Sequence, residues 1–145
     1  MATVKGVNKT AIDAGGLSEK LAAGLVDGRV KVMSDYYTAD ATETAGTVIE
    51  FGGDLVSGAK VLMIVLSCSV AQASLTFSLG DGETAARYLA AGQTGLQTVG
   101  VGVVAAASGA YVVGTVALDS QIILTTAAAT MTAGTVYCQI FYTTD

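Results

Sequence analysis

Histidine, proline and tryptophan are absent from the 145 residues, and charged side chains are scarce. Histidine is the commonest general base and a frequent metal ligand, so its absence excludes Ser–His–Asp and Cys–His catalysis and imidazole-based zinc sites within this chain. Charged residues make up 13% of the sequence, against roughly 25% in an average soluble domain. A surface so poor in charge must be covered by partners or by Thr, Ser and Gly. The first alternative is an early indication of an assembled protein.

Positive charge is especially sparse, with 7 basic residues against 12 acidic ones and a net charge of −5. Such a chain cannot build the basic face that neutralises phosphates, so we expect no nucleic-acid partner. The N-terminus lacks the apolar core of a signal peptide. The uncharged stretch 88–118 is broken up by Gly, Gln, Ser and Thr, so we expect no membrane partner and synthesis in the cytoplasm.

The only two cysteines, Cys68 and Cys138, lie far apart within apolar runs. Two buried free thiols are the favoured interpretation. A bridge between neighbouring strands is the alternative, and spacing alone does not decide between them.

Short runs in which apolar and polar residues alternate, separated by turn residues, dominate the sequence after Gly28. Residues 74–79, for example, place Leu75, Phe77 and Leu79 on one face and hydroxyl side chains on the other. No apolar period of 3.6 residues extends over ten positions. The expected strands are 29–37, 47–51, 60–69, 74–79, 87–91, 96–102, 110–118, 120–128 and 134–144. Residues 60–69 are apolar on both faces, as in a central strand of a sandwich.

This pattern predicts an all-β fold, an antiparallel β-sandwich that is jelly-roll-like. An immunoglobulin-like sandwich is the second choice, although its core tryptophan is missing. Residues 1–28 mix charges and glycines without a sustained period, so we expect an extended N-terminal arm there and the β-sandwich domain over 29–145.

The segment LGDGETAARYL, residues 79–89, concentrates charge in an otherwise uncharged region. Asp81 and Glu83 are too few for a calcium shell, and their charge repels a phosphate. We therefore expect no metal and no cofactor. The favoured interpretation is a turn between two strands, in which Gly80 and Gly82 supply positive φ and Arg87 returns to Asp81 or Glu83.

Four segments, MATVKGVN, DGRVKVMSDYYTA, LTFSLGDGETAARYL and IFYTTD, together resemble the small capsid decoration (cement) proteins of tailed phages. The resemblance implies a jelly-roll-like sandwich on the outer surface of the capsid, bound to the major capsid protein. It also implies a homo-oligomer, for which we favour a trimer over a dimer. Within the arm, the residues expected to contact the capsid are Lys5, Gly6, Val7, Asn8, Lys9 and Thr10.

Our first hypothesis is therefore a decoration protein that binds the assembled head and stabilises it. The alternative is a receptor- or glycan-binding jelly-roll module of a phage fibre or appendage, with a ligand site around 81–87 or 104–110. A small enzyme is the third hypothesis, for which the sequence offers neither a nucleophile–base pair nor a metal cluster. We expect no enzymatic activity.

Overall fold

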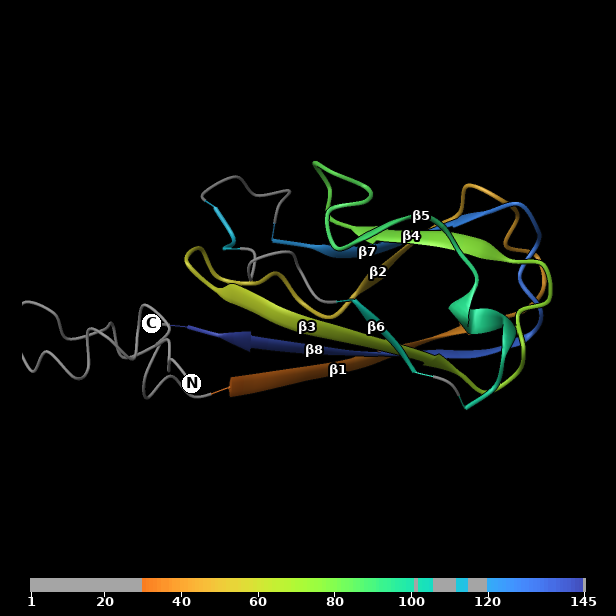
Figure 1. Cartoon of the computed structure of the whole chain (residues 1–145), viewed down its shortest axis with the longest axis horizontal. Coiled ribbons are helices and arrows are strands. Elements are labelled where there is room, and N and C mark those ends of the chain that lie inside the picture. Colours follow the sequence, from red (N-terminus) through yellow and green to blue (C-terminus); the bar gives the residue numbers. More distant parts are fainter. Residues whose placement is uncertain (1–29, 101, 106–111, 115–119, 145) are drawn as a thin grey trace, which may run out of the picture.

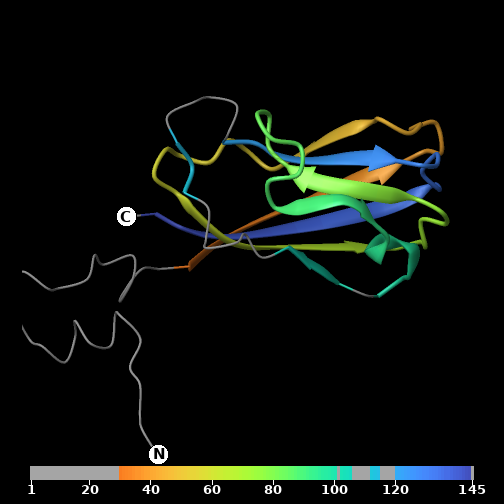
Figure 2. The ribbon, with the colours of Figure 1, turned by 45° about the horizontal axis from the view of Figure 1, so that its top comes forward.

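The computed structural model describes residues 30–100, 102–105, 112–114 and 120–144, which form two stacked four-stranded antiparallel sheets (Figures 1 and 2). The predicted arm, residues 1–28, lies outside these ranges. The strands are β1 (Val30–Ala39), β2 (Val48–Phe51), β3 (Lys60–Cys68), β4 (Thr76–Gly80), β5 (Leu89–Gln93), β6 (Val103–Ala105), β7 (Ile122–Ala127) and β8 (Gly134–Thr143).

The topology is that of a long antiparallel hairpin rolled into a sandwich. β1 pairs with β8, β2 with β7, β3 with β6 and β4 with β5. Rolling adds the pairs β3–β8 and β4–β7, which gives the sheet orders β1-β8-β3-β6 and β2-β7-β4-β5. This is a jelly roll of eight strands, so the predicted fold class is confirmed. The 81–88 segment joins β4 to β5 and is the tip of the rolled hairpin.

The core lies between the sheets and follows the alternation of each strand. The predicted inward residues Leu75, Phe77 and Leu79 are all 0% exposed. From the other sheet, Ile64 and Leu66 of β3 are equally buried. Burial of such side chains is worth about 1.5–3 kcal/mol each relative to leaving them exposed. Strand alternation therefore explains which residues form the core.

The strand predicted over 96–102 is wrong, because residues Gly95–Gln97 form a 3-10 helix, η2, and the next strand begins at Val103. Leu96 is completely buried. Its carbonyl accepts hydrogen bonds from Gln72 N at 3.0 Å and Cys68 Sγ at 3.2 Å. The short helix places Leu96 in the core while satisfying its backbone, which an alternating strand would not do.

Of the predicted strand 110–118, only residues 112–114 are described. There Val112 forms an isolated antiparallel bridge with Lys60. The described segments contain no helix with the length and hydrophobicity that crossing a membrane requires.

Candidate functional site

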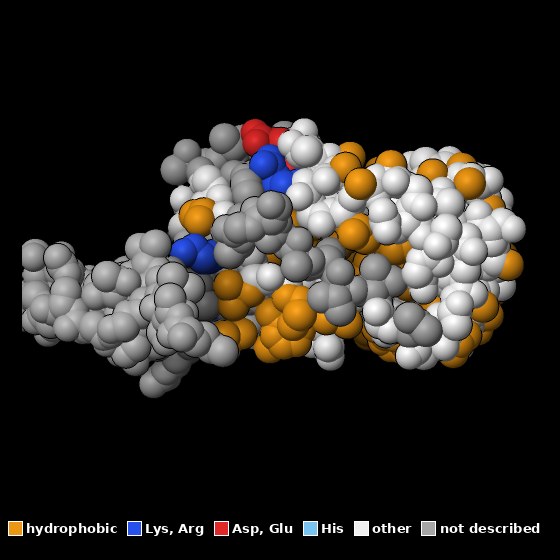
Figure 3. Space-filling model, viewed as in Figure 1, with side chains coloured by type: hydrophobic (Ala, Val, Ile, Leu, Met, Phe, Trp, Pro, Cys, Tyr) orange, Lys and Arg blue, Asp and Glu red, His pale blue; other side chains and the backbone are white. Residues whose placement is uncertain are grey.

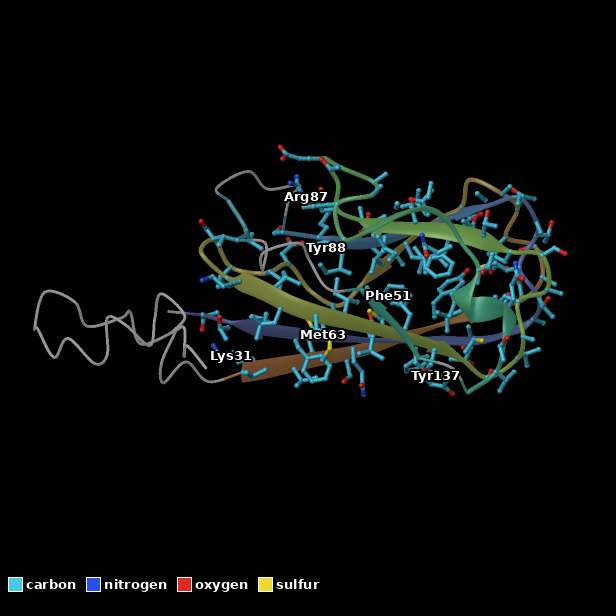
Figure 4. All side chains as sticks on the ribbon, in the orientation of Figure 1. Lys31, Phe51, Met63, Arg87, Tyr88 and Tyr137 are labelled. Carbon is cyan, nitrogen blue, oxygen red and sulfur yellow. The ribbon has the colours of Figure 1, made fainter. Side chains whose placement is uncertain are left out.

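The residues expected to contact a capsid, Lys5 to Thr10, lie outside the described part of the chain. Their role stays a prediction. The second set of predicted site residues, Asp81, Glu83 and Arg87, is described in full, and Figure 4 shows Arg87 at the end of the upper sheet.

Asp81 organises the tip of the rolled hairpin. It is 3% exposed, and its Oδ1 accepts hydrogen bonds from Glu83 N at 3.0 Å and Thr84 N at 2.7 Å. Its Oδ2 accepts a hydrogen bond from Arg87 Nε. Arg87 also lies 3.5 Å from a Glu83 carboxylate oxygen. Both oxygens of the Asp81 carboxylate thus accept hydrogen bonds from its own turn, which is a structural role.

Gly80 is required by a close approach of two backbone segments. A Cβ at this position would lie 2.0 Å from Thr84 O and 2.4 Å from Ala85 C. The prediction that Gly80 and Gly82 supply positive φ is wrong, because neither is among the positive-φ glycines of the described chain. Asp81 holds the turn closed through its hydrogen bonds. Glycine is needed at position 80 because there is no room for a Cβ atom, and not because the backbone has a positive φ.

Other chemistry-bearing groups in the described residues are also tied to the fold. Cys68 and Cys138 are both buried and free. Burial raises the pKa of Cys138 to about 12 and also raises that of Cys68, so neither is a reactive thiolate near neutral pH. Among the residues described, no group of three potential metal ligands occurs.

Glu43 is a nearly buried carboxylate with a structural partner. Tyr37 OH donates to its Oε1 at 2.5 Å, and Glu43 O accepts from Met131 N at 2.9 Å. The hydrogen bond from Tyr37 lowers the pKa of Glu43, and the same bond raises the pKa of Tyr37. The hydrogen bond between Tyr37 and Glu43 thus joins strand β1 to the connection that follows it.

The outer face of the sheet β1-β8-β3-β6 is the next candidate for a functional surface. On β1, Met33, Tyr37 and Ala39 point inward, whereas Val32 and Tyr36 point outward and are 51% and 65% exposed. The ladder register places the outward residues in four rows. We call them the uncharged face: Val32, Phe141 and Met63; Ser34, Gln139 and Val65; Tyr36, Tyr137 and Ser67; Thr38 and Thr135.

None of these eleven side chains is charged, and the first charge, Lys60, appears in the next row, level with Val30 and Thr143. Tyr36 and Tyr137 lie side by side, with ring centroids 6.5 Å apart and the rings tilted by 46°. In Figure 3, hydrophobic atoms gather where β3 and β8 run, and Figure 4 labels Met63 and Tyr137 along the same sheet. Exposed apolar side chains grouped on one face are frequent at contact sites, so the uncharged face is a candidate for one.

The outer face of the other sheet has a different composition. Its outward positions are occupied by alanine and hydroxyl side chains, by the exposed Val48, by a largely covered Ile123 and by the exposed acid Glu50. These positions are Val48 and Glu50 of β2, Ile123, Thr125 and Ala127 of β7, and Thr76 and Ser78 of β4.

The uncharged face is not among the sites predicted from the sequence, although the sequence contains a signal for it. Residues 60–69 are apolar on both sides, which predicts a central strand. β3 does lie between β8 and β6. Its second apolar side, with Met63 and Val65, faces outward, so the same run also places apolar residues on the outer surface of the sheet.

Comparison with known proteins identifies solved structures with a similar fold. No protein-family model matches the chain, and no curated protein does. A chain in the cyanophage Pam1 capsid asymmetric unit has a TM-score of 0.67 and 21% identity, covering 81% of this chain and 86% of that one.

A chain in the acidic stable capsid structure of Helicobacter pylori bacteriophage KHP30 has a TM-score of 0.57 and 14% identity, covering 79% of this chain and 86% of that one. The protein shares its fold with chains from two phage capsids. At these identities the likeness concerns the fold, and any common role is a matter for proposal.

Proposed function

We propose that this protein is a structural component of a phage virion, a decoration protein that binds the outer surface of the assembled head and stabilises it. The observation that carries the proposal is the likeness of its eight-stranded jelly roll to chains of two phage capsid structures, over about four fifths of the sequence. The sequence resemblance to decoration proteins supports the same role.

The physical demands of such a role match the described chemistry. A decoration protein needs a stable fold and contact surfaces, and the buried carboxylates of Asp81 and Glu43 bond to groups of the fold itself. By binding the assembled lattice more tightly than free subunits, the protein would convert its binding energy into shell stability by mass action. Many copies on one lattice turn modest contacts into high occupancy.

The proposed partner is the major capsid protein, contacted by the arm through Lys5 to Thr10. The arm, residues 1–28, contains three basic and three acidic side chains, whereas residues 29–145 contain four basic and nine acidic ones, for a formal charge of 4 − 9 = −5. The arm is thus the part of the chain that carries no net negative charge. An arm that orders on contact can add a strand to a neighbouring sheet or wrap a neighbour.

The test is co-sedimentation of the purified chain with heads of its phage that lack it, and separately with unassembled capsid subunits. We expect binding to heads and little to subunits. Deleting residues 1–16 should leave a folded domain that no longer binds, while Thr125→Ala, on the outer face of β7, should bind as the full chain does.

Decoration at normal occupancy by the truncated protein would refute the role of the arm. Failure of the full chain to bind heads, combined with binding to host cells or to a glycan array, would favour the receptor-binding alternative.

A further inference from the structure

We infer that the uncharged face is a self-association surface, on which a second copy of this chain packs face to face across a two-fold axis. This inference deepens the proposed function, because it names the contact through which decorating copies would pair. It rests on three observations: the composition of the face, the charge of the rest of the domain, and the size of the sheet.

The composition favours a partner of the same chemistry. In a two-fold contact each patch meets its own copy, so a patch that carries charge of one sign meets like charge. The eleven residues of the uncharged face avoid this cost, because they bring only apolar, hydroxyl, phenol and amide groups together. Paired sheet faces of this kind interdigitate at a spacing of about 10 Å, as in the core of a sandwich.

The remaining charge of the domain restricts where two copies can meet. With a formal charge of −5 over residues 29–145, two copies repel one another unless the contact keeps their acids apart. The opposite sheet presents Glu50 outward from β2, and a two-fold contact through that face would bring two such carboxylates into one interface. The uncharged face therefore offers the lower electrostatic cost.

The centre of the face has residues suited to a contact. Tyr36 and Tyr137 expose 65% and 46% of their surface, although they contact each other. Tyrosine supplies a large contact area at a low entropy cost, and it is enriched among the residues that dominate binding energies. Phe141, Met63 and Val65 extend the apolar surface along the neighbouring strands.

The size of the sheet sets the expected strength. The four rows of the uncharged face run from Val32 to Thr38 of β1, about 23 Å, and three strands are about 15 Å wide, so the footprint is roughly 350 Å² per copy. A pair then covers on the order of 700 Å², in the size range of weak and transient interfaces. We expect reversible, concentration-dependent association, reinforced when neighbouring copies are held on one lattice. The self-complementary face argues for two copies rather than the three that the resemblance led us to expect.

The experiment is sedimentation analysis of the full chain from micromolar to high micromolar concentration. We expect a monomer–dimer equilibrium. Tyr137→Lys should weaken it on the order of tenfold or more, because the new charge must be buried in the contact. Thr125→Lys places the same charge on the outer face of the opposite sheet and should leave the dimer unchanged.

Circular dichroism and melting verify that each variant is folded, and Val32→Lys tests the same face from β1 if Tyr137→Lys does not fold. A chain that stays monomeric throughout, a trimer, or a dimer equally tolerant of the charge on both sheets overturns the inference. Head binding by the same variants is measured separately. If the dimer is absent but the full chain still decorates heads, this inference fails and the proposed function stands.

Discussion

The two sheets of the jelly roll have equivalent inner faces and different outer faces. Both contribute fully buried side chains to one core, exemplified by Leu66 in β3 and Phe77 in β4. On the outside, β1, β8 and β3 present tyrosine, valine, phenylalanine and methionine beside serine, threonine and glutamine. The strands β2, β7 and β4 present threonine, serine and alanine beside one valine, one isoleucine and the acid Glu50. Folding alone does not demand this difference, because either composition can cover a sheet.

This difference between the two outer faces distinguishes residues that stabilise the fold from exposed residues that can contact a partner. In the sheet β2-β7-β4-β5, the most constrained residues outside the core lie at the hairpin tip, where Gly80 and Asp81 close the turn. In the other sheet, the distinctive outer residues Tyr36 and Tyr137 contact each other and are largely exposed. Substitutions in each sheet test whether the two outer faces have different roles.

The largest effect is expected from a pair of neighbours on β3. Leu66 is completely buried, whereas Val65 is half-buried on the uncharged face. Leu66→Ala should lower the free energy of unfolding by about 2–5 kcal/mol, as cavity-forming substitutions do. Val65→Ala should lower it by less than about 1 kcal/mol. Urea denaturation at a protein concentration below the association range measures both, and equal losses would mean that the uncharged face belongs to the fold.

A smaller but still large effect is expected at the hairpin tip. Gly80→Ala places a methyl group where Thr84 O lies only 2.0 Å away, so the turn must open. We expect a loss of about 2 kcal/mol or more. Gly53→Ala is the matched control, since a Cβ there meets nothing within 4 Å, and its effect should stay within about 0.5 kcal/mol. If Gly80→Ala and Gly53→Ala are equally stable, the close approach of Thr84 O to Gly80 does not constrain the hairpin tip.

The smallest effect concerns the inner side of β1, where Tyr37 donates to Glu43. The pKa of Glu43 is lowered in the folded protein, so its contribution is present above its ordinary pKa and is lost as the pH falls through the lowered value. Tyr37→Phe should cost about 1.5 kcal/mol at pH 7, as for a hydrogen bond to a charged group. The difference from the unsubstituted protein should shrink on acidification.

Urea denaturation at pH 7 and at a pH below the ordinary pKa of glutamate measures this change. Tyr36→Phe alters the neighbouring outward tyrosine, which is 65% exposed, and should leave the pH profile as it was. A Tyr37→Phe deficit that is constant with pH would show that Glu43 does not titrate as described.

Strand alternation predicted much of the fold from the sequence. The inward positions 75, 77 and 79 are completely buried, and the expected central strand, β3, lies between two neighbours. The 3-10 helix at Gly95–Gln97 was not predicted, because a single buried leucine between small and polar residues has no period. Its conformation depends on hydrogen bonds from Gln72 and Cys68, which lie more than twenty residues earlier.

The candidate surface was less accessible to sequence reasoning than the fold. Alternation shows that Val32 and Tyr36 share one side of β1, and that Met33 and Tyr37 share the other. It does not say which side faces the core, since both contain apolar residues. The connection after β2 decides this, because Gly52 N donates to Asp35 and Gly53 N donates to the Met33 sulfur. Such tertiary contacts cannot be read from local pattern.

The most direct test of the central claim is electron cryomicroscopy of heads assembled with and without this protein. A decoration role predicts eight-stranded sandwiches on the outer surface of the shell in the first sample and their absence in the second, together with a higher temperature of head disruption when the protein is present. Density for the jelly roll at a fibre or appendage, with none on the head, would contradict the account.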